Sequence, residues 1–169
     1  MLPGHGEPPE FGRNRIGYID SKVMSEPKVV ACPNCGQKTR VRAAAEGVPH
    51  CPKCAHPLSW LTDSDVSDFN AVAERSPIPV LIDFWAPWCG PCKIVAPAVE
   101  KLSQELAGKL KAVKVNTDLA PELQERFGVR GIPTLVLMDG GKERDRVVGA
   151  MGVDALRQWV GQRLPARSK

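Results

Sequence analysis

The sequence has no apolar run that approaches the roughly 18 residues needed to span a membrane. Its beginning also lacks the apolar stretch of a secretory signal peptide. Neither sign of charge predominates, because the net charge of the 169 residues is only +4. These absences argue against a membrane protein, an exported protein and a nucleic-acid-binding protein. They favour the cytoplasm, where cysteine thiols stay reduced.

The chain is long enough for one ordinary domain and a small appendage, and its 43% of hydrophobic residues suffices for a real core. Residues 1–23 are rich in proline and glycine and show no hydrophobic period, so we expect residues 1–27 to form a disordered extension. Met1 and Met24 are both possible native starts.

The six cysteines fall into three separate C-x-x-C pairs instead of being spread along the chain. A spread pattern would be typical of a secreted disulfide framework. Three close pairs favour a combination of metal binding and redox chemistry.

The third pair, Cys89 and Cys92, follows the apolar run that begins at Val80. Apolar residues after the pair recur at helical spacing, which puts both cysteines at a helix N-terminus, where free N–H groups and the helix dipole favour a thiolate. We expect Cys89 to be the exposed attacking thiolate and Cys92 to be shielded and to resolve the mixed disulfide. Pro91 suits the first turn of the helix. The alternative is a structural disulfide or half of a zinc site.

The first two pairs, Cys32 with Cys35 and Cys51 with Cys54, are separated by the fifteen residues from Gly36 to His50. This spacing predicts a tetrahedral Cys₄ site for one structural zinc ion, formed by two knuckles. A rubredoxin-like iron site and redox-active disulfides are the alternatives. We expect the flanking histidines, His50 and His56, to be solvated, and the metal to stabilise a segment too small to fold on its own core.

The elements that follow alternate between strands and helices. Thr62-Asp63-Ser64-Asp65 has the spacing of a capping box and predicts a helix start, with Val66, Phe69 and Ala73 facing inward. The remaining expected elements are strands at Val80–Trp85 and Leu110–Val115 around the redox helix, a short helix from Pro121 to Gly128, a hairpin over Thr134–Met138 and Lys142–Val148, and a helix carrying Val153, Leu156, Val160 and Leu164.

At Trp88-Cys89-Gly90-Pro91-Cys92 the sequence resembles the thioredoxin family, whose active-site motif reads the same. The order of elements agrees with this resemblance. It implies an α/β thioredoxin fold, a central mixed sheet flanked by helices, over residues 59–165. A Cys₄ zinc ribbon at residues 28–58 would precede it and a short tail at residues 166–169 would follow. The whole arrangement is similar to the zinc-ribbon-bearing bacterial subgroup often called thioredoxin 2.

Asp83 interrupts an otherwise apolar strand, and burial would raise its pKa toward the range useful for proton transfer. The resemblance assigns Asp83 the transfer of the Cys92 proton and makes Lys114 the lysine that modulates it. It also makes Ile132-Pro133 the cis-proline loop, which would pair with an extended substrate segment. The resemblance implies that the rest of the substrate surface consists of Trp88, Gly90, Pro91, Gly149 and Ala150.

The resemblance implies a monomeric protein-disulfide reductase that exchanges its dithiol with disulfide-containing proteins and is re-reduced by thioredoxin reductase. Nothing in the sequence would bind NADPH or flavin. An oxidase or isomerase is a second enzymatic interpretation, which Gly90-Pro91 and the missing export signal oppose. Two further hypotheses give the Cys₄ site the main role. In one it is a zinc-ribbon module that docks a partner, and in the other a switch that releases zinc on oxidation.

Overall fold

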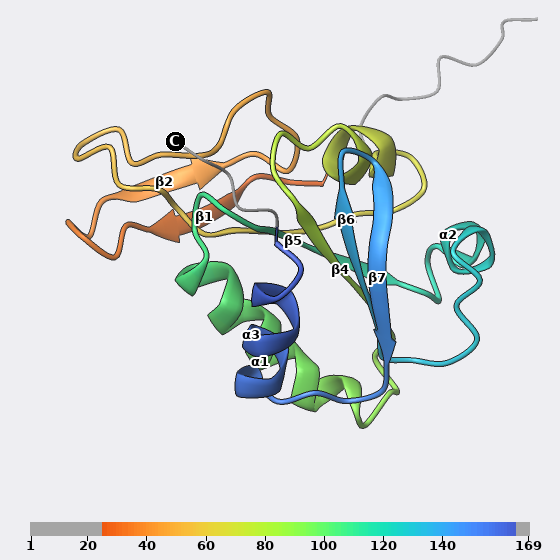
Figure 1. Cartoon of the computed structure of the whole chain (residues 1–169). Helices are drawn as coiled ribbons and strands as arrows, with labels where there is room; N and C mark the ends of the chain where they lie inside the picture. Colours follow the sequence, from red (N-terminus) through yellow and green to blue (C-terminus); the bar gives the residue numbers. More distant parts are fainter. Residues whose placement is uncertain (1–24, 165–169) are drawn as a thin grey trace, which may run out of the picture.

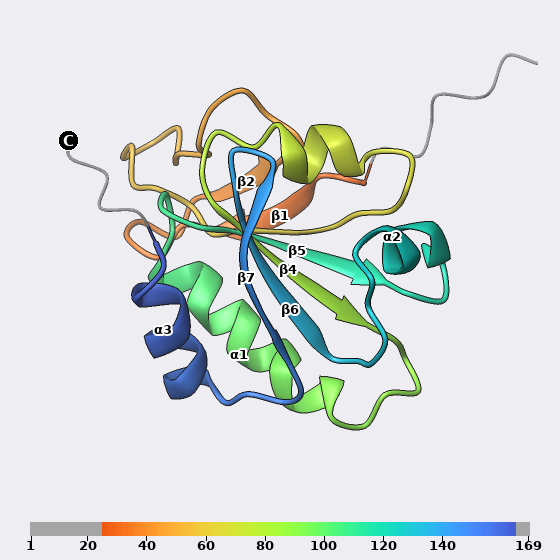
Figure 2. The same ribbon diagram turned by 45° about the vertical axis from the view of Figure 1, so that its right-hand side comes forward.

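The computed structural model describes residues 25–164, so most of the predicted extension at 1–27 and the predicted tail at 166–169 lie outside the described residues. A mixed five-stranded sheet forms the centre, in the strand order β3-β5-β4-β6-β7 (Figures 1 and 2). Its strands are β3 (Trp60–Asp63), β4 (Val80–Trp85), β5 (Lys111–Asn116), β6 (Thr134–Asp139) and β7 (Lys142–Val148). The helices are α1 (Cys92–Glu105), α2 (Pro121–Arg126), α3 (Val153–Gly161) and a π-helical turn, η1 (Asn70–Glu74).

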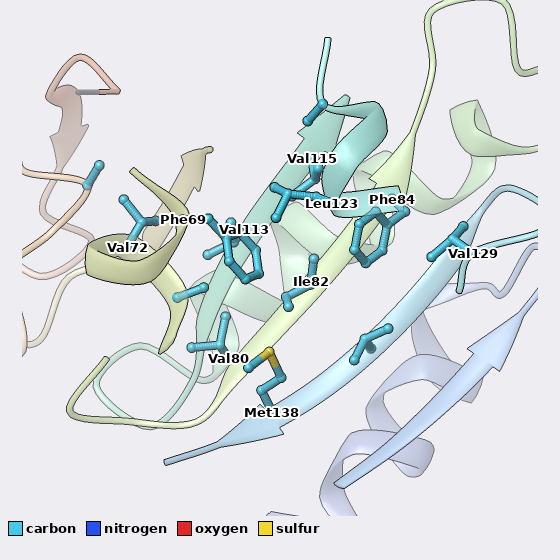
Figure 3. Packing of buried hydrophobic residues seen from close by; sticks show 14 residues of the cluster. Phe69, Val72, Val80, Ile82, Phe84, Val113, Val115, Leu123, Val129 and Met138 are labelled. Atoms are coloured by element: carbon cyan, nitrogen blue, oxygen red, sulfur yellow. The ribbon is translucent and has the colours of Figure 1, made fainter. Parts of the chain in front are cut away.

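The alternation of side chains along β4 explains why helices cover both faces of the sheet. Val80, Ile82 and Phe84 point into one core, which η1 and α2 close (Figure 3). Leu81 points to the opposite core, which α1 and α3 close. Asp83 follows Leu81 on that second face, so the strand delivers a carboxylate beneath the start of α1.

The predicted thioredoxin fold is confirmed by this mixed sheet and its flanking helices. β4 runs parallel to β5 and antiparallel to β6, and β6 and β7 form the predicted hairpin. Gly140 and Gly141 both take positive φ in its turn, which a two-residue hairpin loop of this kind requires. None of the helices among the described residues is long and apolar enough to cross a bilayer.

The prediction of a helix starting at Thr62 is wrong, because Trp60–Asp63 is a strand that pairs in parallel with β5. Thr62 is buried and its hydroxyl donates to the Asp63 carbonyl, so it does not cap a helix. Phe69 and Ala73 are buried as expected, but Val66 is 48% exposed. Pairing with a strand fifty residues further along the chain outweighs the local capping pattern.

A second, two-stranded sheet precedes the large one. It consists of β1 (Lys28–Ala31) and β2 (Lys38–Val41), which pair antiparallel. Its core is shared with the larger sheet, because Cys32, Cys51 and Val41 pack with Trp60 and Ile78. The segment with the first two cysteine pairs therefore lies directly against the five-stranded domain.

Lys111 is a buried lysine, 0% exposed, at the junction of the two parts. Its ammonium donates hydrogen bonds to the carbonyls of Ala43 and Val72 and lies 4.0 Å from the centroid of the Trp60 ring. Burial lowers the pKa of Lys111 to about 7, and the Asp68 carboxylate opposes that shift. The Trp60 indole N–H donates to the Arg42 carbonyl at 2.8 Å, so two side chains of the large domain hold the same short backbone segment.

Candidate functional site

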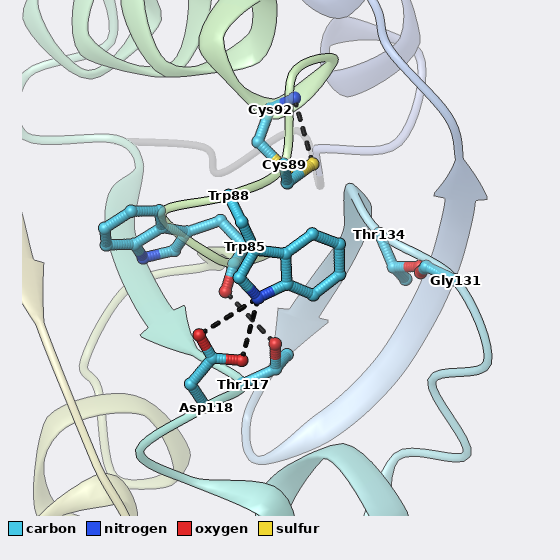
Figure 4. Close-up of a disulfide and its surroundings, with 8 residues drawn as sticks. All are labelled: Trp85, Trp88, Cys89, Cys92, Thr117, Asp118, Gly131 and Thr134. Carbon is cyan, nitrogen blue, oxygen red and sulfur yellow. Dashed lines mark hydrogen bonds between the residues drawn. A yellow bond between two sulfur atoms is a disulfide. The ribbon is translucent and has the colours of Figure 1, made fainter.

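A disulfide joins Cys89 and Cys92 in the turn between β4 and α1 (Figure 4). The predicted place at a helix N-terminus is confirmed, because α1 begins at Cys92 with Pro91 as its N-cap. The backbone N–H of Cys92 donates to Cys89 Sγ at 3.2 Å. A donor at this position stabilises negative charge on Cys89 when the bond is open, since a thiolate accepts hydrogen bonds more strongly than a thiol.

The expected difference in exposure between the two cysteines is absent from this oxidised form. Cys89 and Cys92 are both only 4% exposed. They pack with Ala86, Trp85 and Ile132, whose apolar side chains cover the sulfurs. The direction of the Cys92 N–H, and not solvent exposure, distinguishes the two sulfurs here.

The loop before β6 lies against the cysteine pair, and its Ile132-Pro133 peptide bond is cis, as predicted. Gly149, at the end of β7, donates its N–H to the Pro133 carbonyl at 2.8 Å, which brings Gly149 and its neighbour Ala150 beside the loop. Thr134 Oγ1 donates to the Gly131 carbonyl at 2.6 Å and closes the loop on itself (Figure 4). The structure thus brings together the loop and the small residues that were predicted to flank the site.

Trp88 is 71% exposed and stands beside the disulfide (Figure 4). Gly90 and Pro91, in the same turn, are also exposed. The Trp88 indole N–H donates to both carboxylate oxygens of Asp118, each at 3.1 Å. Asp118 was not among the predicted site residues. A signal was available, because Asp118 follows β5, and the carboxyl ends of neighbouring parallel strands meet at one edge of a sheet.

Asp83 is 1% exposed and lines a cavity of about 140 Å³ together with Cys89, Cys92 and Lys114. Burial raises the pKa of Asp83 to about 6, and the Lys114 ammonium opposes that shift. Asp83 and Lys114 are direct neighbours in the β4–β5 register. Neither carboxylate oxygen of Asp83 has a hydrogen-bond partner among the described residues. A buried carboxylate without partners beside a cysteine is suited to exchange a proton through water.

Replacing Asp83 by asparagine should stabilise the fold at neutral pH. The native state holds the Asp83 proton more tightly than the unfolded chain does, so the cost of the buried charge grows between about pH 4 and pH 6 and is complete above pH 6. At pH 7.5 we expect Asp83→Asn to raise the free energy of unfolding by about 2–3 kcal/mol, as measured by urea denaturation of the oxidised protein.

At pH 4 the same substitution should change the free energy of unfolding by much less, because Asp83 is then protonated in the native state. Glu122→Gln, on the exposed face of α2, is the matched control for the loss of one carboxylate. An equal gain at both pH values would show that the charge of Asp83 is not the cause.

The sulfurs of Cys32, Cys35, Cys51 and Cys54 all lie within 4.8 Å of one another. The Sγ atoms of Cys32 and Cys54 are 3.6 Å apart, and those of Cys35 and Cys51 are 3.5 Å apart. Four sulfurs around a tetrahedral zinc ion with bonds of about 2.3 Å would be about 3.8 Å apart. The cluster therefore fits a metal ion of this kind, whereas a disulfide would need about 2.05 Å.

The two knuckles have the same backbone geometry. Gly36 donates its N–H to the Cys32 carbonyl at 2.9 Å, and Ala55 donates to the Cys51 carbonyl at 2.8 Å. Both residues take positive φ, 72° at Gly36 and 57° at Ala55, so the alanine that stands where the first knuckle has glycine leaves the turn of the second knuckle intact. His50 and His56 are exposed and lie outside the cluster of four sulfurs, as predicted.

A cysteine pair that closes a disulfide at a helix N-terminus of this fold defines a thiol–disulfide oxidoreductase. The family model described as Thioredoxin matches residues 61–162, more than half of the chain. The chain therefore belongs to the thioredoxin family.

Three named relatives agree with that assignment. The chain is 48% identical over 98 residues to Thioredoxin 1 of a Nostoc species, covering 58% of this chain and 92% of that protein. It is 55% identical over 88 residues to Thioredoxin of a Synechocystis species, covering 52% of this chain and 81% of that protein. It is 39% identical over 159 residues to Thioredoxin M4, chloroplastic, of Arabidopsis thaliana, covering 90% of this chain and 82% of that protein.

Proposed function

We propose that this protein reduces protein disulfides with the Cys89–Cys92 couple. The observation that carries the proposal is the disulfide at the start of α1, with the Cys92 N–H directed at Cys89 Sγ. In the reduced protein the Cys89 thiolate attacks one sulfur of a substrate disulfide. The substrate S–S bond breaks, its second sulfur leaves as a thiolate that takes up a proton, and Cys89 is joined to the substrate.

The resolving step returns the protein to its oxidised form. Cys92 loses its proton to Asp83 through water in the shared cavity, and its thiolate attacks Cys89 Sγ. The mixed disulfide breaks, the Cys89–Cys92 bond forms, and the second substrate thiolate leaves and takes up a proton. Two electrons pass from the dithiol to the substrate. Lys114 stabilises the ionised form of Asp83 and so tunes this transfer.

The groove for the substrate would be formed by Trp88, the Ile132-Pro133 loop, and the small residues Gly149 and Ala150 beside that loop. The Ile132 backbone would pair with an extended substrate segment, because main-chain pairing accepts many sequences. The exposure of Trp88 and the contact of Ile132 with the cysteine pair support this assignment.

For the N-terminal part we propose a ribbon at residues 28–58 in which Cys32, Cys35, Cys51 and Cys54 hold one structural zinc ion. The sulfur spacing and the two matched knuckles support this, and bound zinc would supply stability to a segment with little core of its own. The catalytic domain would then be residues 59–165. With such a ribbon the chain would fit the zinc-ribbon thioredoxins, acting in the cytoplasm as a monomer.

The electron donor is tested by insulin reduction. We expect the zinc-loaded protein to support NADPH consumption when it is combined with thioredoxin reductase and insulin. A parallel reaction replaces the reductase and NADPH with dithiothreitol, and reactions without the protein give the background rate. Turnover in both arms supports the proposed disulfide-reducing activity of this protein and thioredoxin reductase as its electron donor.

Activity with dithiothreitol but not with thioredoxin reductase would preserve the chemistry and exclude that electron donor. Absence of activity in both arms would contradict the proposed function itself. The test therefore separates the exchange reaction of the cysteine pair from the identity of its reductant.

A further inference from the structure

The two sheets expose strand edges to each other. Within residues 25–164, β1 pairs only with β2, and β3 is the last strand of the large sheet. Lys28 Nζ contacts the Asp63 carboxylate at 2.6 Å, so a side chain from the start of β1 reaches the end of β3. Figures 1 and 2 both show β1 alongside the chain that leads into η1, over the C-terminal end of α1.

The hydrogen-bond pattern identifies the backbone groups at the outer edge of β1. The N–H of Cys32 donates to the Gln37 carbonyl at 2.9 Å, in register with the ladder between β1 and β2. Bonded and non-bonded pairs alternate along an antiparallel ladder, so Val30 and Lys28 direct their backbone groups toward β2. Val29 and Ala31 direct their N–H and C=O groups away from it. Among residues 25–164, β1 has no second neighbouring strand, and none of the turn and loop hydrogen bonds involves these groups.

The hydrogen-bond pattern also identifies the backbone groups at the outer edge of β3. The N–H of Ser64 donates to the Lys114 carbonyl at 2.9 Å, which continues the parallel ladder with β5. In a parallel ladder, alternate residues bond to the neighbouring strand. The backbone groups of Trp60 and Thr62 are therefore directed toward β5, whereas those of Leu61 are directed toward the free edge. Each strand thus has a short free edge.

A cavity of about 490 Å³ lies between β1 and α1 and reaches Leu61 of β3. All four consecutive residues of β1 line it, as expected for a strand that presents its backbone edge and not one of its faces. The other walls come from Pro33, Ser59, Leu61, Glu100, Ser103, Gln104 and Ala107. We call this cavity the β1 groove.

The β1 groove lies well away from the disulfide. Its α1 residues run from Glu100 to Ala107, and α1 begins at Cys92. At 1.5 Å per helical residue these residues are about 12 Å or more from the cysteines along the helix axis. A segment bound in the groove would leave the cysteine pair free to react.

The side chains of the groove define the ligand. Val29 is 61% exposed and, with Leu61 and Pro33, provides apolar surface. Glu100 lines the groove and makes no ion pair within the described chain, whereas the charge of Lys28 is already balanced by Asp63. The groove therefore complements a segment with apolar side chains and one basic side chain.

We propose that the β1 groove binds an extended segment of a partner protein, which adds to β1 as a strand. Backbone groups of the segment pair with Val29 and Ala31, alternate apolar side chains cover Leu61, and a lysine or arginine meets Glu100. Unpaired strand edges are templates for such addition, and main-chain pairing supplies the affinity. The groove would hold a partner at a second place while Cys89 acts on its disulfide.

The test uses the zinc-loaded, oxidised protein labelled with nitrogen-15, so that it does not depend on redox activity. The probe is a cysteine-free peptide of about six residues that alternates valine and threonine and contains one central lysine. We expect saturable amide shifts at Val29 and Ala31 with a dissociation constant below about 1 mM, and none at Cys89 or Cys92. Absence of shifts at β1 up to about 5 mM peptide would overturn the proposal.

Backbone pairing is tested on the peptide first, because this leaves the protein unchanged. Two versions are methylated at the backbone nitrogens of odd or of even residues. Strand addition requires that at least one of them bind at least tenfold more weakly, since one edge of the peptide loses its donors. Equal binding by all three peptides would show that side chains alone are recognised and would contradict the proposal.

Variants of the protein test the same contacts. Val29→Pro removes the outward N–H and should weaken binding at least fivefold, whereas Val29→Thr keeps that N–H and should bind normally. Glu100→Gln should weaken binding of the lysine peptide several-fold and leave a glutamine version unaffected. Concentration-dependent shifts at β1 without any peptide would instead identify a second copy of the chain as the occupant and refute a separate partner.

Discussion

Cys89→Ser is expected to lower the rate of insulin reduction to the background rate, a loss of at least about a thousandfold. The attacking group must be a thiolate, and a serine hydroxyl is neither ionised near neutral pH nor able to form a disulfide. The N–H of Cys92 would remain directed at the side chain of residue 89, so the site would keep its shape and lose only the sulfur. The rate is measured with dithiothreitol as the reductant, which removes any dependence on a reductase.

Cys92→Ser is the matched variant, because it makes the same atomic change three residues further on. It should also stop turnover, but by a different route. Without added reductant, Cys89 would still attack, and the mixed disulfide would persist because residue 92 no longer supplies the thiol that resolves it. Non-reducing electrophoresis should therefore show a covalent complex with substrate for Cys92→Ser and none for Cys89→Ser. The reverse result would exchange the roles of the two cysteines.

Loss of one proposed metal ligand should have the largest effect on stability. We expect Cys51→Ser to reduce the metal content from one zinc ion per chain to nearly none and to unfold residues 28–58. The sheet of β1 and β2 has four residues in each strand, too few to persist without the ion. Hydrogen exchange at β1 and β2 amides should accelerate by several orders of magnitude, because zinc binding of this kind contributes on the order of 10 kcal/mol to folding.

His50→Ala is the control for this prediction, since His50 flanks the second knuckle but lies outside the cluster of sulfurs. It should retain the metal and the slow exchange. Elemental analysis also tests the alternative of iron, which would give the protein a visible absorption band. Full zinc occupancy in Cys51→Ser, or loss of zinc in His50→Ala, would show that the ligand set is wrong.

The five-stranded domain should survive removal of the metal, although it should become less stable. Its two cores contain no proposed ligand, so insulin reduction by Cys51→Ser should persist. Trp60 and Lys111 would lose their contacts with the Arg42 and Ala43 carbonyls, which leaves a buried ammonium with fewer partners.

Several features could be predicted because their cause is local. The spacing of Cys89 and Cys92 after an apolar strand identified the redox pair and the start of its helix. Two glycines after Asp139 identified the hairpin, since a tight turn with positive φ requires them. The two remaining cysteine pairs predicted a cluster that is compact in the structure.

Other features could not be predicted because they depend on contacts between distant segments. Trp60–Asp63 becomes a strand only through its pairing with β5, against a sequence pattern that favoured a helix start. The burial of Cys89 depends on Ile132, which comes from the loop before β6, more than forty residues further along the chain. Lys111 interrupts an apolar run just as Asp83 does, but the carbonyls that receive its hydrogen bonds lie 39 and 68 residues away.

The sequence by itself therefore determined the chemistry: a reactive cysteine pair at a helix start, a carboxylate in an apolar strand, and four thiols suited to one metal ion. Residue type and short spacing decide such features, because reactivity and ligand geometry act over a few residues. Only the tertiary structure decided how the cysteine-rich segment lies against the catalytic domain, and with it the buried Lys111 and the β1 groove. These depend on how two separate sheets pack against each other, and that packing is set by side chains far apart in the chain.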